Sequence, residues 1–174
     1  MTTRIVFSGF GGQGVLTIGQ MVATIAMRQG KEVTWMPSYG PEMRGGTANC
    51  AVIISDSTIG SPQIVSDIDV LCAMNQPSVD KFVPKMKSGG TVLYNSSLVP
   101  EGISRTDVKA FGIDATNIAA NMGNLKVQNM VMLAGFLKET KLFTLDEIKA
   151  AMSEKFDGKA DVIALNVAAI EKGM

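Results

Sequence analysis

The sequence predicts an α/β fold: a Rossmann-like three-layer single domain with a mixed sheet and a helical C-terminal part, spanning residues 1–174. Three observations predict it. Short apolar segments alternate with helical patterns until about residue 112, a glycine-rich turn joins the first strand to the first helix, and helical patterns fill the chain after residue 114. No linker, repeat or low-complexity run interrupts the chain, so one domain is expected.

The first part of the chain has the pattern of strand, turn and helix. Residues 5–8 form a short apolar strand, and apolar residues recur at helical spacing over residues 15–28, with Gly30 as a natural stop. Residues 33–36 are a second apolar strand. Together these segments predict a βαβ unit with parallel strands and a right-handed crossover.

The middle of the chain contains further strands. In residues 48–54 both the odd-numbered and the even-numbered positions are largely apolar, which predicts a strand buried on both faces. A turn with a local hairpin is expected at residues 56–59. Residues 70–74 and 91–94 are further apolar strands, separated by a helix predicted over residues 78–87.

The last strand is expected at residues 108–112, and helices follow it. Thr144, with Glu147 three residues later, has the spacing of a capping box at the start of one of these helices. The predicted helices span residues 114–121, 127–139, 145–155 and 160–172.

Composition excludes several classes of function. A chain of 174 residues that is 46% hydrophobic can bury a sizeable core. Sixteen basic and sixteen acidic residues cancel, so neither nucleic acid nor an anionic membrane surface is an expected partner. No segment has the roughly twenty apolar residues that span a bilayer, and the first residues lack a signal-peptide pattern, so a cytoplasmic location is expected.

The inventory of reactive side chains is equally restrictive. The chain has no histidine, which removes the usual base of Ser-His and Cys-His nucleophilic catalysis. Its two cysteines, Cys50 and Cys72, cannot hold an iron–sulfur cluster, which needs four thiolates. Both lie in apolar strands, and buried free thiols are favoured there over a disulfide. We expect no catalytic residue and no metal ligand set on this chain.

The first glycine loop, residues 9–14, joins the first strand to the first helix. Its glycines satisfy G-x-G-x-x-G, a pattern whose backbone N–H groups and helix dipole favour an anion. A structural turn for close helix–sheet packing explains the same glycines equally well. A dinucleotide site also needs an acidic residue at the end of the second strand, whereas Glu32 stands at its beginning. The loop consists of Gly9, Phe10, Gly11, Gly12, Gln13 and Gly14.

The second glycine loop, residues 38–50, combines glycine-dictated shape with charge. Arg44 has a planar fork of donors that suits a carboxylate or phosphate, and Glu42 could hold that fork in place. An aromatic ring beside an arginine on a stiff loop is typical of a docking site. The alternative is an exposed ion pair that only fixes the shape of its own loop. The loop carries Tyr39, Glu42, Met43, Arg44, Gly45, Gly46 and Asn49.

Polar residues follow two of the predicted strands. Asn75 and Asn95 come directly after apolar strands, so both are expected on the same rim as the glycine loops. Capping of the following helix is the favoured interpretation, and lining of a pocket is the alternative. Asn129, near the start of a later helix, could cap that helix or contact a partner chain.

The two glycine loops closely resemble the gamma subunit, or gamma-type domain, of the 2-oxoacid:ferredoxin oxidoreductases. The resemblance covers nearly the whole chain, and the second loop is its most specific part. It continues through Ile59-Gly60-Ser61-Pro62, Ala73-Met74-Asn75-Gln76, Gly123-Asn124, Asn129, Asn166, Ala169 and Gly173.

The resemblance implies a division of labour between subunits. In this family thiamine diphosphate with Mg, and iron–sulfur clusters, perform the redox step, and the sequence has no motif for them, so other chains would carry them. The implied partners are the alpha, beta and ferredoxin-like delta subunits, with ferredoxin reached through the complex. In single-chain relatives the equivalent domain is implicated in handling coenzyme A.

These implications give a set of site residues. Coenzyme A carries phosphates, so the contacts expected for it are Gly9, Gly11, Gly12, Gln13, Gly14 and Arg44. The expected subunit interface or pocket rim consists of Tyr39, Glu42, Met43, Gly45, Gly46, Asn49, Asn75 and Asn95. We hypothesise that both loops form a wall of the acyl-transfer compartment.

Two other functions fit the sequence less well. One is an autonomous nucleotide-binding oxidoreductase that uses the first loop, and the other is a structural interaction module without a ligand. Among 2-oxoacids, 2-oxoglutarate is favoured by the look of a short, free-standing gamma chain, while pyruvate and branched-chain 2-oxoacids stay open.

Overall fold

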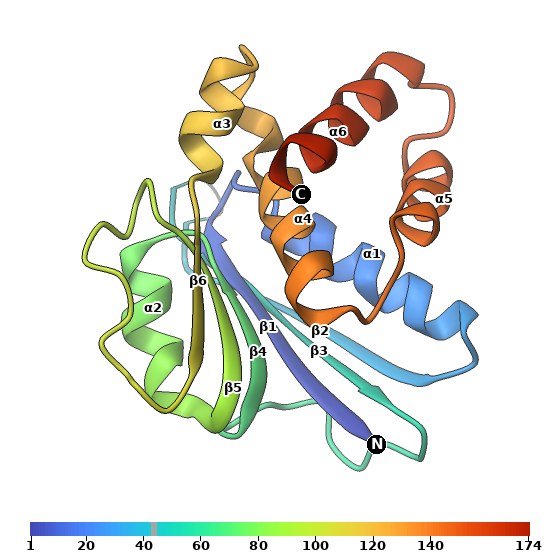
Figure 1. Cartoon of the computed structure of the whole chain (residues 1–174). Coiled ribbons are helices and arrows are strands. Elements are labelled where there is room, and N and C mark those ends of the chain that lie inside the picture. Colours follow the sequence, from blue (N-terminus) through green and yellow to red (C-terminus); the bar gives the residue numbers. More distant parts are fainter. Residues whose placement is uncertain (43–44) are drawn as a thin grey trace.

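One mixed sheet of six strands forms the centre of the molecule, with strand order β2-β3-β1-β4-β5-β6 (Figure 1). The structure is a computed structural model and describes residues 1–42 and 45–174. The strands are β1 (Thr2–Phe10), β2 (Glu32–Tyr39), β3 (Thr47–Ser55), β4 (Ile68–Ala73), β5 (Met86–Asn95) and β6 (Lys109–Ile113). The helices are α1 (Val15–Arg28), α2 (Gln76–Phe82), α3 (Ala115–Asn121), α4 (Gln128–Thr140), α5 (Leu145–Lys155) and α6 (Ala160–Gly173), with short 3-10 turns η1 (Val83–Lys85) and η2 (Leu125–Val127).

The sheet is parallel on one side of β1 and antiparallel on the other. Strand β1 pairs parallel with β4, and the parallel ladder continues through β5 to β6. On its other side β1 pairs antiparallel with β3, which forms a hairpin with β2. The expected βαβ unit therefore has strands that run in the same direction, β1 and β2, but β3 lies between them.

Two local predictions were wrong. No hairpin forms at residues 56–59, because β3 takes its partners from β1 and β2, and the chain after Ser55 crosses to β4 without regular structure. The helix expected over 78–87 instead spans Gln76–Phe82. Pro84 lies in the following 3-10 turn, and proline cannot donate a helical hydrogen bond. Strand β5 then begins at Met86.

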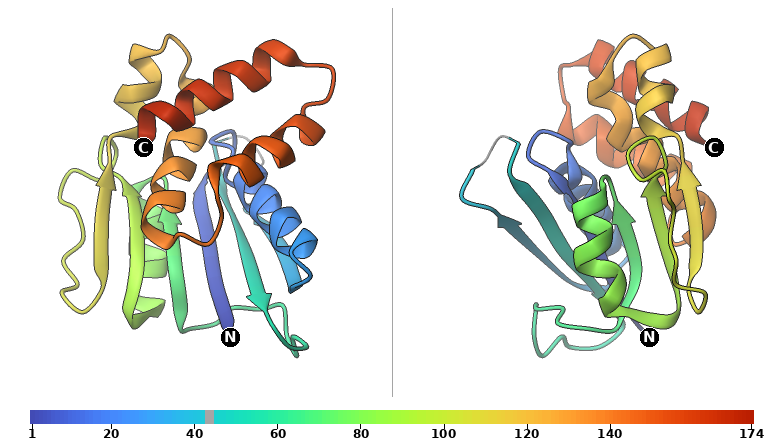
Figure 2. Two further views of the ribbon diagram at one scale, coloured as in Figure 1. Left: turned by 45° about the vertical axis from the view of Figure 1, so that its right-hand side comes forward. Right: turned by 90° about the vertical axis from the view of Figure 1, so that its left-hand side faces the viewer.

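The two faces of the sheet carry separate apolar cores, because successive strand residues point to opposite faces. Ile5 and Phe7 face α1 and the helices of the C-terminal part, whereas Val6 faces α2. Phe7 packs against Phe136 of α4, with ring centroids 5.5 Å apart. The molecule is therefore a three-layer α/β fold, as the apolar pattern predicts (Figure 2).

The C-terminal helices cover one face of the sheet in two tiers. Helix α4 lies against β5 and β6, and α6 packs on α4, while α5 packs on α1 (Figures 1 and 2). Helix α5 begins with the predicted capping box, in which Thr144 and Glu147 exchange hydrogen bonds. Among the described residues, no helix has the length and apolar character needed to cross a membrane.

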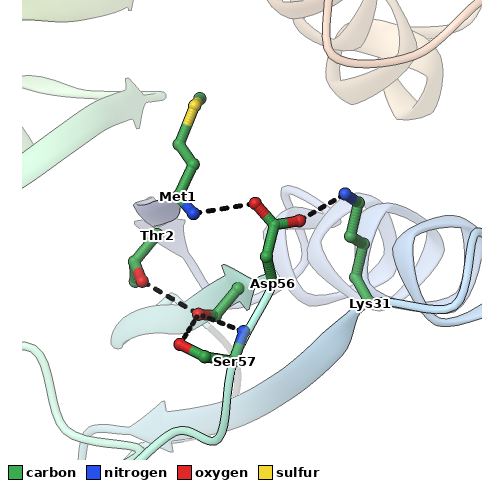
Figure 3. A network of polar contacts seen from close by, with 6 residues as sticks. Met1, Thr2, Lys31, Asp56 and Ser57 are labelled. Carbon is green, nitrogen blue, oxygen red and sulfur yellow. Dashed lines mark hydrogen bonds and ion pairs between the residues drawn. The ribbon is translucent and has the colours of Figure 1, made fainter.

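A polar network stands at the amino-terminal end of β1, opposite the glycine loops. The Asp56 carboxylate accepts a hydrogen bond from the Met1 amino group at 2.7 Å and pairs with Lys31 (Figure 3). The Thr2 hydroxyl contacts that of Ser55 at 2.9 Å. Lys31, followed by the amino group, lowers the pKa of Asp56 to about 2. This network ties the start of β1 to the end of β3.

The two cysteines lie on either side of Phe7, in the two strands that flank β1. Phe7 is paired with Cys50 of β3 and with Cys72 of β4. Adjacent strands are about 4.8 Å apart, which places the two cysteine Cα atoms about 9.6 Å apart, beyond the roughly 7 Å that a disulfide can bridge. Both thiols are free and buried.

Candidate functional site

The first glycine loop forms a tight turn between β1 and α1. The Gln13 N–H donates to the Phe10 carbonyl at 3.1 Å, which closes the turn. Gly12 and Gly14 have φ angles of 96° and 75°, in the left-handed region that favours glycine. Gly14 is also the N-cap residue of α1. The glycines at these positions are therefore required by the shape of the turn.

The turn leaves backbone donors at the start of α1. The first N–H groups of a helix have no partner within the helix. Thr17 and Ile18 donate to the Gly14 carbonyl. Within residues 1–42 and 45–174, the N–H groups of Gly12, Gly14 and Val15 have no hydrogen-bond partner. Such donors, at the positive end of a helix dipole, suit an anionic group.

A first brace holds the loop from the α2 side. The Gln13 side chain folds back, and its Oε1 accepts hydrogen bonds from the Phe10 N–H at 2.7 Å and from Asn75 Nδ2 at 3.3 Å. A Cβ on Gly9 would lie 2.7 Å from this Oε1 and 2.9 Å from Met74 Cβ. Gly9 therefore allows close packing beneath the loop.

A second brace comes from α4, on the opposite face of the sheet. Asn129 Nδ2 donates to the Gly14 carbonyl at 3.3 Å, and a Cβ on Gly14 would lie only 2.3 Å from the same nitrogen. Asn129 is almost fully buried. Its side chain thus fixes the start of α1 and leaves no room for a larger residue at position 14.

The second glycine loop is joined to the first by its backbone. The Gly11 N–H donates to the Gly46 carbonyl at 2.8 Å, and the Gly45 N–H donates to the Gly11 carbonyl at 3.3 Å. The Gly40 N–H donates to the Thr47 carbonyl at 2.7 Å and closes the hairpin of β2 and β3. Met43 and Arg44, which the sequence singles out, lie outside the described residues.

An open pocket of about 580 Å³ lies between the first loop and the β2–β3 hairpin. Tyr39 forms part of its wall, and 51% of this residue is exposed. Glycine backbone and apolar side chains together fit a ligand that joins an anionic group to an apolar one. The pocket is lined by Phe10, Gly11, Gly12, Gly14, Val15, Leu16, Tyr39 and Ala48.

Three predicted rim residues, Asn49, Asn75 and Asn95, do not line this pocket. Asn49 and Asn75 line a small polar niche on the α2 face, together with Gly9, Ser8 and Ser78. Asn75 is the N-cap of α2, where its Oδ1 accepts from the Ser78 N–H at 3.0 Å, so the capping interpretation is confirmed. Its amide nitrogen nevertheless reaches the first loop.

Asn95 is buried beneath the rim. Its Nδ2 donates to Thr116 Oγ1 at 2.8 Å and to the Met74 carbonyl at 3.4 Å, which links the ends of β4 and β5 to α3. Its side chain is fully buried, so it holds the rim together. Glu42 is exposed beside Gly46, whose Cβ, if present, would lie 2.2 Å from the Glu42 carbonyl oxygen.

The site differs from the ribose site of dinucleotide-binding folds. In those folds the acidic residue stands at the carboxyl end of the strand that follows the first helix. Here Glu32 begins β2 and Tyr39 ends it. Seven residue steps along a strand place Glu32 roughly 20 Å or more from the first loop. Strand β3 also lies between β1 and β2.

The two cysteine thiols are buried and unreactive. Burial raises the pKa of Cys50 to about 12, so the thiol stays protonated, and its Sγ donates to the Val15 carbonyl at 3.6 Å. Burial likewise raises the pKa of Cys72 to about 12. Among the described residues, no group of three or more His, Cys, Asp or Glu side chains could hold a metal ion.

Several residues of the site escape the sequence motifs. Ser8 and Ser78 extend the brace beneath Gln13, and Asn129 holds Gly14. Each is an ordinary polar residue in a strand or near a helix start, so its role depends on a contact between distant parts of the chain. Of the three, only Asn129 is singled out by the sequence, near the start of a predicted helix, and no pattern predicts its contact with Gly14.

The fold and sequence are similar to proteins of one enzyme family. The gamma subunit of keto/oxoacid ferredoxin oxidoreductase from Geobacter sulfurreducens PCA has a TM-score of 0.81 and 29% identity, over 98% of this chain and 95% of that chain. The 2-oxoglutarate:ferredoxin oxidoreductase from Magnetococcus marinus, with 2-oxoglutarate, coenzyme A and succinyl-CoA bound, has a TM-score of 0.84 and 28% identity, over 99% of this chain and 30% of that chain.

Sequence comparison agrees with the structural one. Subunit VorA of ketoisovalerate oxidoreductase from Methanothermobacter thermautotrophicus is 41% identical over 172 residues, which are 98% of this chain but 35% of the relative. The chain thus spans about a third of the length of this relative. The sequence model for pyruvate ferredoxin/flavodoxin oxidoreductase matches residues 4–174. The chain belongs to the pyruvate ferredoxin/flavodoxin oxidoreductase family.

Proposed function

We propose that this chain is the gamma subunit of a hetero-oligomeric 2-oxoacid:ferredoxin oxidoreductase and supplies one wall of its coenzyme A compartment. The complex would decarboxylate a 2-oxoacid oxidatively, form an acyl-coenzyme A and reduce ferredoxin. The observation that carries the proposal is the direct backbone pairing of Gly11 with Gly45 and Gly46, which unites both glycine loops beside one pocket.

The pocket fits the chemistry of coenzyme A. A pyrophosphate would accept hydrogen bonds from the backbone N–H groups of Gly12, Gly14 and Val15. Tyr39 and Leu16 would contact the less polar pantetheine part. Coenzyme A supplies the thiol that accepts the acyl group, and the residues of this chain would bind and orient it. Cys50 is buried and its thiol stays protonated, so it would not compete with the thiol of coenzyme A for the acyl group.

The redox chemistry is assigned to other subunits. Thiamine diphosphate with Mg and the iron–sulfur clusters would lie on alpha, beta and delta chains, which reach ferredoxin. The choice of 2-oxoacid would then be made at the thiamine site. 2-Oxoglutarate remains our first candidate substrate, and the similarity to VorA favours 3-methyl-2-oxobutanoate (ketoisovalerate) as the second.

A reconstitution assay tests this function. The chain is purified with its native partners, and coenzyme A-dependent viologen reduction is measured with 2-oxoglutarate, ketoisovalerate and pyruvate. We expect turnover that saturates with coenzyme A in the complex and none with the isolated chain. Turnover by the isolated chain, or strong binding of NAD or FAD to it in calorimetric titration, would instead support an autonomous oxidoreductase.

A further inference from the structure

A chain of hydrogen bonds with defined direction ends at Gln13. Ser8 Oγ donates to Ser78 Oγ at 2.9 Å, and Ser78 Oγ donates in turn to Asn75 Oδ1 at 2.7 Å. Asn75 Oδ1 also accepts from the Ser78 N–H at 3.0 Å. Two donors on Oδ1 fix which side of the Asn75 amide carries oxygen, so its Nδ2 faces Gln13.

The orientation of the Gln13 carboxamide follows from its neighbours. Its Oε1 accepts from Asn75 Nδ2 at 3.3 Å and from the Phe10 N–H at 2.7 Å. A carboxamide is planar, so an oxygen that is held inward directs the nitrogen to the other side. In the part of the chain that the structure describes, Gln13 Nε2 has no hydrogen-bond partner and is not fully buried.

Gln13 lies close to both hollows at this end of the sheet. Its neighbours Gly12 and Gly14 line the 580 Å³ pocket, and its partner Asn75 lines the polar niche on the α2 face. Gln13 itself lines neither hollow; its backbone neighbours line the first, and its hydrogen-bond partner lines the second. Three buried or nearly buried residues, Ser8, Asn75 and Ser78, serve to hold it there.

We propose that Gln13 Nε2 is a directed hydrogen-bond donor to an oxygen of the bound acyl-acceptor, and that Asn75, Ser78 and Ser8 are its positioning residues. This inference rests on the proposed function. The ligand atom is a phosphate or carbonyl oxygen, because an amide N–H pair recognises acceptors only. The chain of donors excludes the opposite orientation, which would place Gln13 Nε2 against the Phe10 N–H.

Two variants disturb the outward group by different routes. Gln13→Glu keeps an oxygen for Phe10 and Asn75 but replaces the outward nitrogen by a carboxylate oxygen. Asn75→Asp keeps the helix cap, since aspartate is a good N-cap residue, but replaces the Nδ2 donor by an oxygen that repels Gln13 Oε1 and so displaces the carboxamide. Gln63→Glu adds the same charge in an exposed loop and is the matched control.

The measurement is the KM for coenzyme A in the reconstituted complex, with kcat and the thermal midpoint recorded for each variant. We expect the KM to rise roughly 10- to 100-fold for Gln13→Glu, the range of a hydrogen bond to a charged group, and to rise also for Asn75→Asp. The kcat and thermal midpoint should stay near the wild-type values, and Gln63→Glu should change none of these quantities.

The outcomes separate the two levels of the account. An unchanged KM in Gln13→Glu, in a complex whose wild type saturates with coenzyme A, overturns the role of Gln13 alone. A fall in thermal midpoint of both variants with no change in KM assigns the network to stability and also overturns it. A wild-type complex that does not saturate with coenzyme A overturns the proposed function, and the inference with it.

Discussion

The two glycine loops meet at one pocket but are held in different ways. The first loop is braced by side chains from two helices on opposite faces of the sheet, Asn75 at the start of α2 and Asn129 in α4. For the second loop, the described residues show backbone bonds to the first loop and across its own hairpin. Its strand β2 forms an edge of the sheet, and Tyr39 is half exposed.

The difference indicates which part of the site the chain builds by itself. A loop that is fixed by buried side chains keeps its shape without a partner, which is what preorganised anion binding requires. A loop on an edge strand, with an exposed aromatic residue, presents the kind of surface that other chains contact. We therefore expect changes in the first loop to affect folding, and changes in the second to affect assembly and binding.

Gly14→Ala should have the largest effect. The new Cβ would lie 2.3 Å from Asn129 Nδ2 at a φ of 75°, so left-handed strain adds to a steric clash. We expect a loss of about 2–4 kcal/mol in the free energy of unfolding, measured by urea denaturation. Gly12→Ala is the control, because its φ is 96° but no atom lies within 4 Å of the new Cβ. Equal losses in both variants would show that Asn129 does not restrict position 14.

Asn129→Ala should have the next largest effect on the free energy of unfolding. It removes the side-chain donor from α4 to the Gly14 carbonyl, which keeps the N–H groups of Thr17 and Ile18, and it removes the buried amide that packs against Gly14. We expect a loss of about 1–2 kcal/mol in the free energy of unfolding. Asn121→Ala, an exposed position in α3, should stay within about 0.5 kcal/mol of wild type. No difference between the two variants would show that α4 does not support the loop.

Tyr39→Ala should separate folding from function. The residue is 51% exposed and lines the pocket, so the free energy of unfolding should change by less than about 0.5 kcal/mol. In the reconstituted complex, either the KM for coenzyme A or the yield of assembled complex should change by several-fold. Tyr39→Phe keeps the ring and should retain most of the wild-type assembly and affinity for coenzyme A. Wild-type assembly and kinetics in Tyr39→Ala would place the second loop outside the site.

Asp56→Asn should have the smallest effect, at the edge of the sheet opposite the loops. The pKa of Asp56 is lowered to about 2, chiefly by Lys31, from 3.8. A lowered folded-state pKa contributes stability above about pH 4, and that contribution is lost as the pH falls to about 2. Thermal unfolding of wild type and variant should therefore converge over this window. A constant difference from pH 7 to pH 2 would contradict the ion pair.

The sequence predicts most of the elements because their signals are local. Helix α5 spans Leu145–Lys155 as expected, since its cap depends on residues three apart. The hairpin at residues 56–59 was misplaced because strand pairing depends on distant partners: β3 pairs with β1 and β2, which precede it. The helix predicted to reach residue 87 ends at Phe82, because Pro84 lacks the N–H that a further helical turn needs.

The site is only half visible in the sequence. Turn geometry selects Gly12 and Gly14, and a glycine motif reports such geometry directly. The residues that support the turn are 70 positions apart for Ser8 and Ser78, and 115 apart for Gly14 and Asn129. No local pattern encodes such contacts. The same limit applies to Gln13, whose side-chain oxygen accepts a hydrogen bond from Asn75, 62 positions away.

Hydrogen exchange on the assembled complex, with and without coenzyme A, tests the central claim most directly. We expect coenzyme A to slow exchange at the amides of Gly12 and Gly14 in the first loop, at that of Val15 at the start of α1, and at those of Gly45 and Gly46 in the second loop. Protection confined to other subunits, with both loops of this chain unchanged, would contradict the claim that the two loops form one wall of the coenzyme A compartment.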